Sequence, residues 1–145
     1  YVQNVDTYDN WAMTGRTTMY EYGNSTMLMS PSVTGMMKLT FIPWKKAAVS
    51  IDGKYVGMQY LDNTMTLSRS IPSYFVSNLS VSHTFVLNSG RLRLALYVNN
   101  LFNNMYYADG WCWKNIIEED GALVDGIGIY PQAPVNYMLK ASYRF

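Results

Sequence analysis

The most regular feature of the sequence is an alternation of apolar and polar residues with a period of two. It is clearest near the C-terminus, where the polar positions are Asn136, Lys140, Ser142 and Arg144, with Met138 as the exception, and the apolar positions are Val135, Tyr137, Leu139, Ala141, Tyr143 and Phe145. Residues two apart in a strand lie on the same face of a sheet. The segment is therefore predicted to be a strand with one apolar and one polar face.

Four earlier segments repeat this alternation, so the sequence predicts five strands, at about 33–43, 46–60, 74–87, 91–106 and 132–145. Several are longer than the ~5–6 residues of a typical soluble strand. They suit the ~9–11 residues with which a tilted strand crosses a bilayer.

The predicted connections alternate in length. Residues 43–46 and 88–90 are short turns, whereas 61–73 and 108–131 are expected to be long loops, and 1–32 another long polar-aromatic loop with a strand end at residues 1–5. Short turns at one end and long loops at the other are typical of outer-membrane barrels, whose long loops are extracellular.

Composition narrows the classes further. Of 145 residues, 49% are hydrophobic, 15% aromatic and only 14% charged, against about a quarter charged in a soluble domain. The aromatic surplus excludes a disordered chain, no apolar run reaches the ~18 residues of a membrane helix, and the net charge of +1 gives no general attraction to nucleic acid. A soluble β-rich domain or a membrane β-barrel remains.

The aromatic residues fall near the ends of the predicted strands, as in the interfacial belts of membrane barrels. Those at the short-turn end are Phe41, Trp44, Phe85, Tyr143 and Phe145. Those toward the long-loop end are Tyr55, Tyr60, Tyr74, Phe75, Tyr106, Tyr107 and Tyr137.

Several strings resemble the C-terminal end of TonB-dependent outer-membrane receptors, particularly those of Bacteroidetes. They are residues 53–64, the Asn-Asn-Leu-Phe-Asn string at 99–103, the Tyr-Pro-Gln-Ala string at 130–133 and the terminal Tyr-Arg-Phe. The sequence departs from the family pattern at Asn104 and Met105, where the family has a basic residue.

The resemblance implies an antiparallel all-β fold, in which this chain supplies about the last five strands of a 22-stranded transmembrane barrel. It implies active uptake of a scarce nutrient, such as siderophore-bound iron, haem or cobalamin, across the outer membrane of a Gram-negative cell. TonB would act only through an N-terminal part that this chain lacks. Because the sequence starts without Met or a signal peptide, we expect a fragment with 1–32 as a loop and 33–145 as barrel strands.

Open strand edges in lipid cost several kcal/mol for each unpaired backbone group. We therefore expect partners: the plug and other strands of the receptor, or copies of this chain, together with outer-membrane lipid and the barrel assembly machinery. Three alternatives stay open. They are a glycan-importing receptor of the same superfamily, an eight-stranded adhesion or structural barrel that needs three strands in residues 1–32, and a soluble β-sandwich binding module.

Two groups of candidate functional residues stand out. Exposed aromatic rings on loops can stack on sugars or chelate rings, or can pack loops together, which makes Trp11, Trp111, Trp113 and Tyr130 candidate substrate contacts. The alternating terminus resembles the outer-membrane assembly signal, carried here by Tyr137, Leu139, Tyr143 and Phe145.

The sequence shows no catalytic constellation, so we expect neither an enzyme nor a cofactor or metal site. The single histidine, His83, shares the apolar face of its strand and is interpreted as an interfacial residue, and Cys112 as an inert loop residue. Residues 118–120 are interpreted as a solvated loop tip, and Gly53 and Gly57 as a close backbone approach or a bend.

Overall fold

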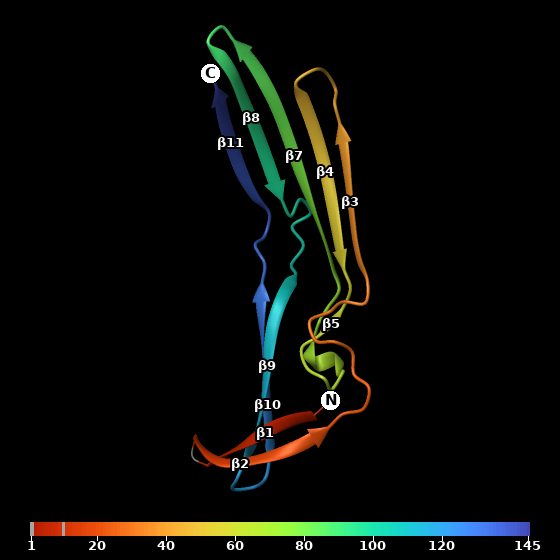
Figure 1. Cartoon of the computed structure of the whole chain (residues 1–145), viewed down its shortest axis with the longest axis vertical. Helices are drawn as coiled ribbons and strands as arrows, with labels where there is room; N and C mark the ends of the chain where they lie inside the picture. Colours follow the sequence, from red (N-terminus) through yellow and green to blue (C-terminus); the bar gives the residue numbers. More distant parts are fainter. Residues whose placement is uncertain (1, 10) are drawn as a thin grey trace. The chain divides into compact units, whose positions relative to one another are not determined.

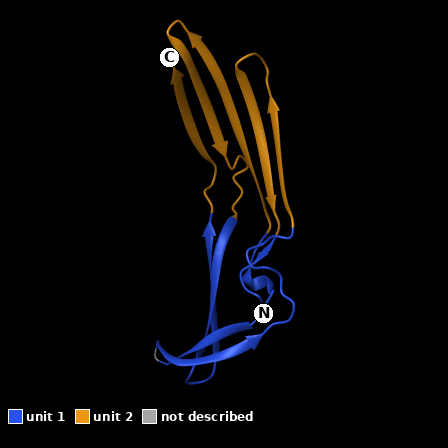
Figure 2. Ribbon diagram, in the orientation of Figure 1, with its two compact units in different colours: residues 1–32, 58–72, 107–131 blue, residues 33–57, 73–106, 132–145 orange. Residues whose placement is uncertain are grey.

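The computed structural model describes residues 2–9 and 11–145 and shows an all-β protein with two larger open sheets, of four and five strands. Neither sheet closes into a barrel within these residues. Of the strand end predicted at residues 1–5, Tyr1 lies outside the described residues, and residues 2–5 do form the start of a strand. The chain divides into two compact units: unit 1 comprises 1–32, 58–72 and 107–131, and unit 2 comprises 33–57, 73–106 and 132–145 (Figure 2).

Unit 2 is a five-stranded antiparallel sheet with the spatial order β11-β8-β7-β4-β3 (Figure 1). Its strands are β3 (Thr34–Phe41), β4 (Ala47–Val56), β7 (Tyr74–Leu87), β8 (Gly90–Asn99) and β11 (Asn136–Arg144). Each strand pairs with the next one of this unit along the chain. The five predicted strands are therefore present, but β4 ends at Val56 and not at 60, and β11 begins at Asn136 and not at 132.

The two faces of this sheet also follow the predicted alternation. Directly opposite residues share a face, and Lys38 lies opposite Asp52 on the polar face, whereas Leu39 lies opposite Ile51 on the apolar face. The Asn78 amide extends the polar row by donating a hydrogen bond to Asp52, at 2.7 Å. The polar face thus holds its charges beside amides and hydroxyls.

Connections of unequal length leave the two ends of this sheet. Residues 42–46 and 88–89 form the turns of the β3–β4 and β7–β8 hairpins at one end. Because all five strands are antiparallel, the segments that belong to unit 1 leave and re-enter the sheet at its other end. The predicted alternation of short and long connections is therefore present.

Strand β8 ends earlier than the predicted 91–106 because Asn100 turns the chain. This residue has a φ of 52° and is 2% exposed. Its side-chain amide donates hydrogen bonds to the carbonyl oxygens of Asn104, at 2.9 Å, and Ala133, at 3.1 Å, while its side-chain oxygen accepts one from the Asn104 N–H. Asn tolerates this left-handed conformation better than most residues do. The asparagine-rich string thus ends a strand and ties it to the segment before β11.

Unit 1 contains a four-stranded sheet with the order β10-β9-β1-β2. Its strands are β1 (Val2–Asp9), β2 (Ala12–Glu21), β9 (Tyr107–Ile117) and β10 (Leu123–Pro131). The β1–β2 and β9–β10 hairpins are joined by parallel pairing of β1 with β9, with Asp6 opposite Asn115. This parallel pair departs from the antiparallel fold that the sequence indicated.

A small element of unit 1 completes its core. It consists of β5 (Gln59–Tyr60), a 3₁₀ turn at Leu67–Arg69 and β6 (Ser70–Ile71). Ile71 is fully buried and Val5 is 1% exposed. No helix among the described residues is long and apolar enough to cross a membrane.

Residues 1–32 and 108–131 are more regular than the loops that the sequence indicated. Residues 1–32 hold two full strands, and β9 and β10 form a hairpin of 11 and 9 residues. These strands lack a clean apolar alternation. Strand β2 is rich in Thr and β9 carries Trp, and both residue types have a high strand propensity.

Close backbone approaches explain several strand glycines. A Cβ at Gly126 would lie 2.5 Å from Nε1 of Trp113, and one at Gly128 would lie 2.3 Å from Nε1 of Trp111. In unit 2 the Phe75 ring covers Gly53 in the same way, at 2.8 Å. The close approach that the sequence indicated at Gly53 is confirmed, and aromatic rings cover the exposed backbone at all three sites.

Replacing Asn100 tests its role in unit 2. We expect Asn100→Gly, which keeps the positive φ and removes only the side-chain hydrogen bonds, to lower the free energy of unfolding by about 1–3 kcal/mol. Denaturant titration of the folded chain measures this loss. Asn99→Ala is the matched control, because Asn99 makes one exposed hydrogen bond to Asn136. An equal loss in both variants would contradict the assignment.

Candidate functional site

A cavity of about 740 Å³ lies in unit 1, lined by strands β1, β9 and β10 and the adjoining turns. Its walls combine aromatic rings with carboxylates: Tyr8, Trp11 and Trp113, and Asp9, Glu118 and Glu119. Asn115, Ile117 and Val124 complete the lining. Small-molecule sites are commonly concave, with apolar walls and a few polar groups, and occupy about 300–1,000 Å³.

The strand register brings these residues together. Tyr8 lies beside Ile117 in the parallel β1–β9 pair, although the two are 109 positions apart in the sequence. Trp113 lies over Gly126 of β10, where the missing side chain makes room for the indole ring. Trp11 has a φ of 69° in the turn after β1 and is 99% exposed, so its ring belongs to the rim.

One of the cavity carboxylates is already paired. Arg16 Nη1 lies 2.5 Å from Glu118 Oε1, and the Arg16 side chain is 76% exposed. Among the described residues, no group of three His, Cys, Asp or Glu is placed to hold a metal ion. The cavity therefore offers flat aromatic surfaces and carboxylate acceptors.

The structure separates the four candidate substrate contacts into two sets. Trp11 and Trp113 line the cavity, whereas Trp111 and Tyr130 lie beyond its described lining. Trp111 nevertheless shares a face of the sheet with Trp113, and Tyr130 follows Gly128 on the same face of β10. Their exposed fractions are 50% and 53%.

Most of the polar lining does not follow from the sequence pattern. The pattern predicts a solvated loop tip at Glu118 and Glu119, but these residues line the cavity. It gives no indication of Asp9 or Asn115. A run of acids five residues after Trp113 is the local feature that could have drawn attention to them.

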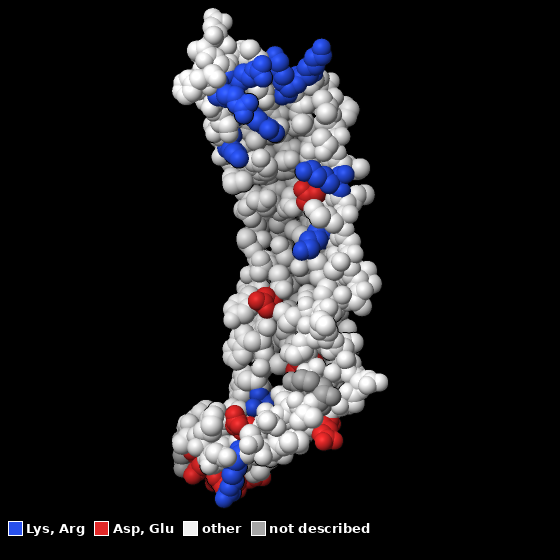
Figure 3. Space-filling model, in the orientation of Figure 1, with Lys and Arg blue, Asp and Glu red and all other residues white. Residues whose placement is uncertain are grey.

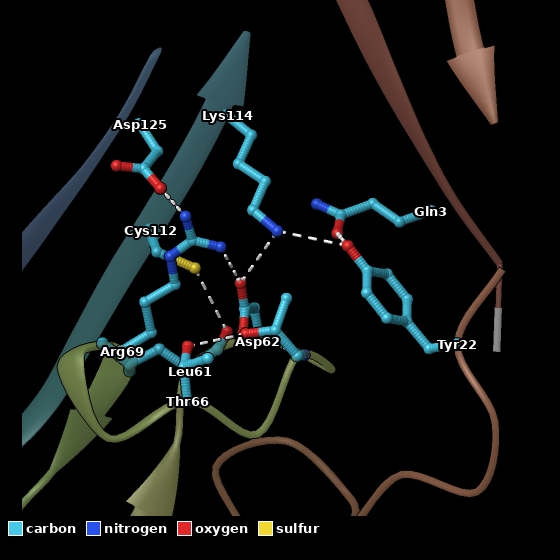
Figure 4. Close-up of polar contacts among 10 residues, drawn as sticks. Gln3, Tyr22, Leu61, Asp62, Thr66, Arg69, Cys112, Lys114 and Asp125 are labelled. Carbon is cyan, nitrogen blue, oxygen red and sulfur yellow. Dashed lines mark hydrogen bonds and ion pairs between the residues drawn. The ribbon is translucent and has the colours of Figure 1, made fainter. Parts of the chain in front are cut away.

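The other face of the four-stranded sheet carries an ion-pair cluster (Figure 4). Arg69 donates a hydrogen bond from Nη1 to Asp62 Oδ2 at 2.8 Å and also pairs with Asp125 on β10. Lys114 Nζ lies 3.6 Å from the same Asp62 oxygen and donates a hydrogen bond to the Tyr22 hydroxyl at 3.2 Å. The cluster ties residues 58–72 to β9 and β10.

The electrostatics of this cluster favour the ionised Asp62 carboxylate. Burial alone would raise the pKa of Asp62, but hydrogen bonds from Thr64 and Arg69 and the nearby Lys114 charge outweigh it and hold the pKa below its ordinary value. Burial, together with the Asp62 charge, raises the pKa of the Cys112 thiol. A raised pKa opposes thiolate formation, which agrees with the interpretation of Cys112 as inert. Cys112 lies on β9, however, and not in a loop.

The candidate assembly residues lie on the apolar face of β11 and just after it. Tyr137 and Leu139 are 70% and 74% exposed. Tyr143 packs edge-on against Phe145, with ring centroids 4.9 Å apart, and its hydroxyl lies 2.7 Å from Ser89 Oγ in the β7–β8 turn. The end of the chain is thereby fixed against the short-turn end of unit 2.

His83 lies on the apolar face of β7 between aromatic rings. Its ring is 4.5 Å from that of Phe85 and 6.3 Å from that of Trp44, measured between centroids. Among the described residues, its Nδ1 is buried without a hydrogen-bond partner. These neighbours suit an aromatic belt better than a metal site, which needs several ligands.

Comparison of the chain with protein-family models, with curated proteins and with solved structures gives no match.

Acidification tests the Asp62 cluster. The pKa of Asp62 is lower in the folded chain than in the unfolded chain, so its carboxylate stabilises the fold above about pH 4 and this stabilisation is lost as the pH falls through the lowered value. We expect Asp62→Asn to lower the free energy of unfolding at neutral pH and to remove part of its acid dependence. Denaturant titrations at neutral and acidic pH measure both effects.

Asp109→Asn is the matched control, because Asp109 is an exposed carboxylate on β9. It should change the free energy of unfolding little at either pH. Parallel acid dependence in the native chain and Asp62→Asn would show that the cluster does not stabilise unit 1.

Proposed function

We propose that this chain supplies the C-terminal strands of the barrel of a TonB-dependent receptor in a Gram-negative outer membrane. The receptor would import a scarce nutrient such as siderophore-bound iron, haem or cobalamin. The observation that carries the proposal is the apolar face of the five-stranded sheet, which has exposed residues on every strand and aromatic residues toward both ends.

The exposed fractions show how open this face is. Leu39 is 59% exposed, Leu96 42% and Leu139 74%, and these residues lie on β3, β8 and β11. Soluble monomers rarely expose contiguous apolar patches beyond a few hundred Å². An apolar face spread over five strands is explained if lipid covers it.

The length of β7 supports a membrane position. Its aromatic residues Phe75 and Phe85 are ten positions apart, which is about 34 Å along an extended strand. For a strand tilted by about 35–45°, this corresponds to roughly 25 Å along the membrane normal, the usual height of the apolar band. The two rings would then mark its two interfaces.

The strand edges support a larger assembly. Strands β3 and β11 are the edges of the sheet. Because unpaired backbone groups are costly in lipid, both edges need partner strands there. Other strands of the same receptor, or copies of this chain, would supply them, and the polar face with Lys38, Lys140 and Arg144 would meet a plug or water.

The order of short and long connections supports an orientation in the membrane. The hairpin turns of unit 2 would be periplasmic, and the three segments of unit 1 would be extracellular, where the aromatic cavity could capture ligand. The eight-stranded alternative loses support, because residues 1–32 hold two strands, and they belong to the other sheet, where β1 pairs with β9 and β2 with β1.

A charge placed on each face of β11 tests the proposal. We expect Leu139→Arg in the complete receptor to destabilise the folded barrel by about 2–4 kcal/mol, because it places a cation at mid-depth on the lipid face. Met138→Arg is the matched control: Met138 is 52% exposed on the polar face and should tolerate the charge. The fraction with heat-modifiable gel mobility in outer-membrane extracts measures folding. Solubility without detergent, or equal folding of both variants, would overturn the proposal.

Deleting Phe145 tests the assembly role of the terminus. We expect the complete receptor without this residue to reach the outer membrane at a lower level, because the assembly machinery would lose its terminal aromatic contact. Phe145→Tyr keeps an aromatic ring at the terminus and should restore insertion. Normal insertion of the deletion variant would contradict the assignment.

A further inference from the structure

We infer that the cavity of unit 1 binds a ligand through an organic cation, a protonated amine or a quaternary ammonium group. The inference deepens the proposed function by naming the charge of the ligand. It rests on that function only for the import step, because binding itself needs no barrel.

Aromatic rings form much of the cavity surface. Trp113 and Trp11 are 38% and 99% exposed, so both indoles present surface to a ligand. Tyr8 adds a third ring from β1. A cation held within about 6 Å of such rings is attracted by their quadrupoles, most strongly for Trp.

Carboxylates give the cavity a negative charge. Asp9, Glu118 and Glu119 line the same cavity, and none of its described lining residues is Lys or Arg. Arg16 partly neutralises Glu118. Asp9 and Glu119 do not take part in this ion pair. An anionic ligand, such as a haem propionate or an anionic ferric chelate, would meet repulsion here, so among the nutrients proposed above this cavity favours those that carry a cationic group.

The surroundings of the cavity reinforce this preference. Unit 1 carries nine Asp or Glu against three Lys or Arg, a side-chain net charge of −6, whereas unit 2 carries one Asp against eight Lys or Arg. The three cations of unit 1 are Arg16, Arg69 and Lys114, and each is paired with an acid. Figure 3 shows the contrast in composition between the two units. The field around unit 1 therefore raises the local concentration of cations.

Choline and its uncharged isostere 3,3-dimethyl-1-butanol separate charge from shape. We expect choline to change the tryptophan fluorescence of the complete chain, folded in detergent micelles, in a saturable manner. The neutral alcohol should bind at least about tenfold more weakly, because it keeps the shape but loses the cation–π and carboxylate attractions. Raising the salt concentration should weaken choline binding.

Matched variants locate the site. Glu119→Gln removes one charge, and Trp113→Phe keeps an aromatic ring over Gly126 but weakens the cation–π attraction; each should weaken choline binding about threefold to tenfold. Trp111→Phe, on the same face of β9 but outside the cavity lining, should leave it unchanged. Circular dichroism verifies that each variant keeps its strand content.

Equal binding of choline and the neutral alcohol would overturn the inference. So would an equal loss in Trp113→Phe and Trp111→Phe, or saturable binding of maltose without choline binding, which would indicate a sugar site. These outcomes are independent of heat-modifiable gel mobility. Failure of the cation site therefore leaves the barrel proposal standing, and the reverse also holds.

Discussion

The exposed apolar face of the five-stranded sheet is the constraint on which the rest of this structure depends. A sheet of long strands with Leu39, Leu96 and Leu139 in contact with water would bear a large hydrophobic cost. Its edges, β3 and β11, also carry unpaired backbone groups. The proposed lipid on the apolar face and further strands at the edges would answer both requirements, and they would also explain why the charges of unit 2 lie on its polar face and short turns.

Unit 1 is stabilised differently. A parallel β1–β9 pair joins two hairpins, and the Asp62 cluster attaches residues 58–72 to one face of the resulting sheet. The opposite face is thereby left to the aromatic residues Trp111 and Trp113, which lie over glycines of β10. The same sheet thus has one face occupied by a structural ion-pair cluster and one face available to a ligand.

Local pattern predicted unit 2 well because each of its strands obeys one rule, alternation between an apolar and a polar face. The predicted end of β8 at residue 106 is wrong, because Asn100 ends the strand through hydrogen bonds to Asn104 and Ala133. Apart from the start of β1, the strands of unit 1 were not predicted, because they lack a regular alternation of apolar and polar residues. These strands are stabilised by pairing with segments distant in the sequence, and a local alternation of residues does not reveal such pairing.

The sequence by itself determined the five strands of unit 2, their two faces and the alternation of short and long connections, since these follow from spacing along the chain. Only the tertiary structure decided the partners of β1 and the assembly of the cavity. Tyr8 and Trp113 meet there because β1 pairs with a strand more than a hundred positions away. No local pattern encodes such a contact, because its stability arises from the pairing itself.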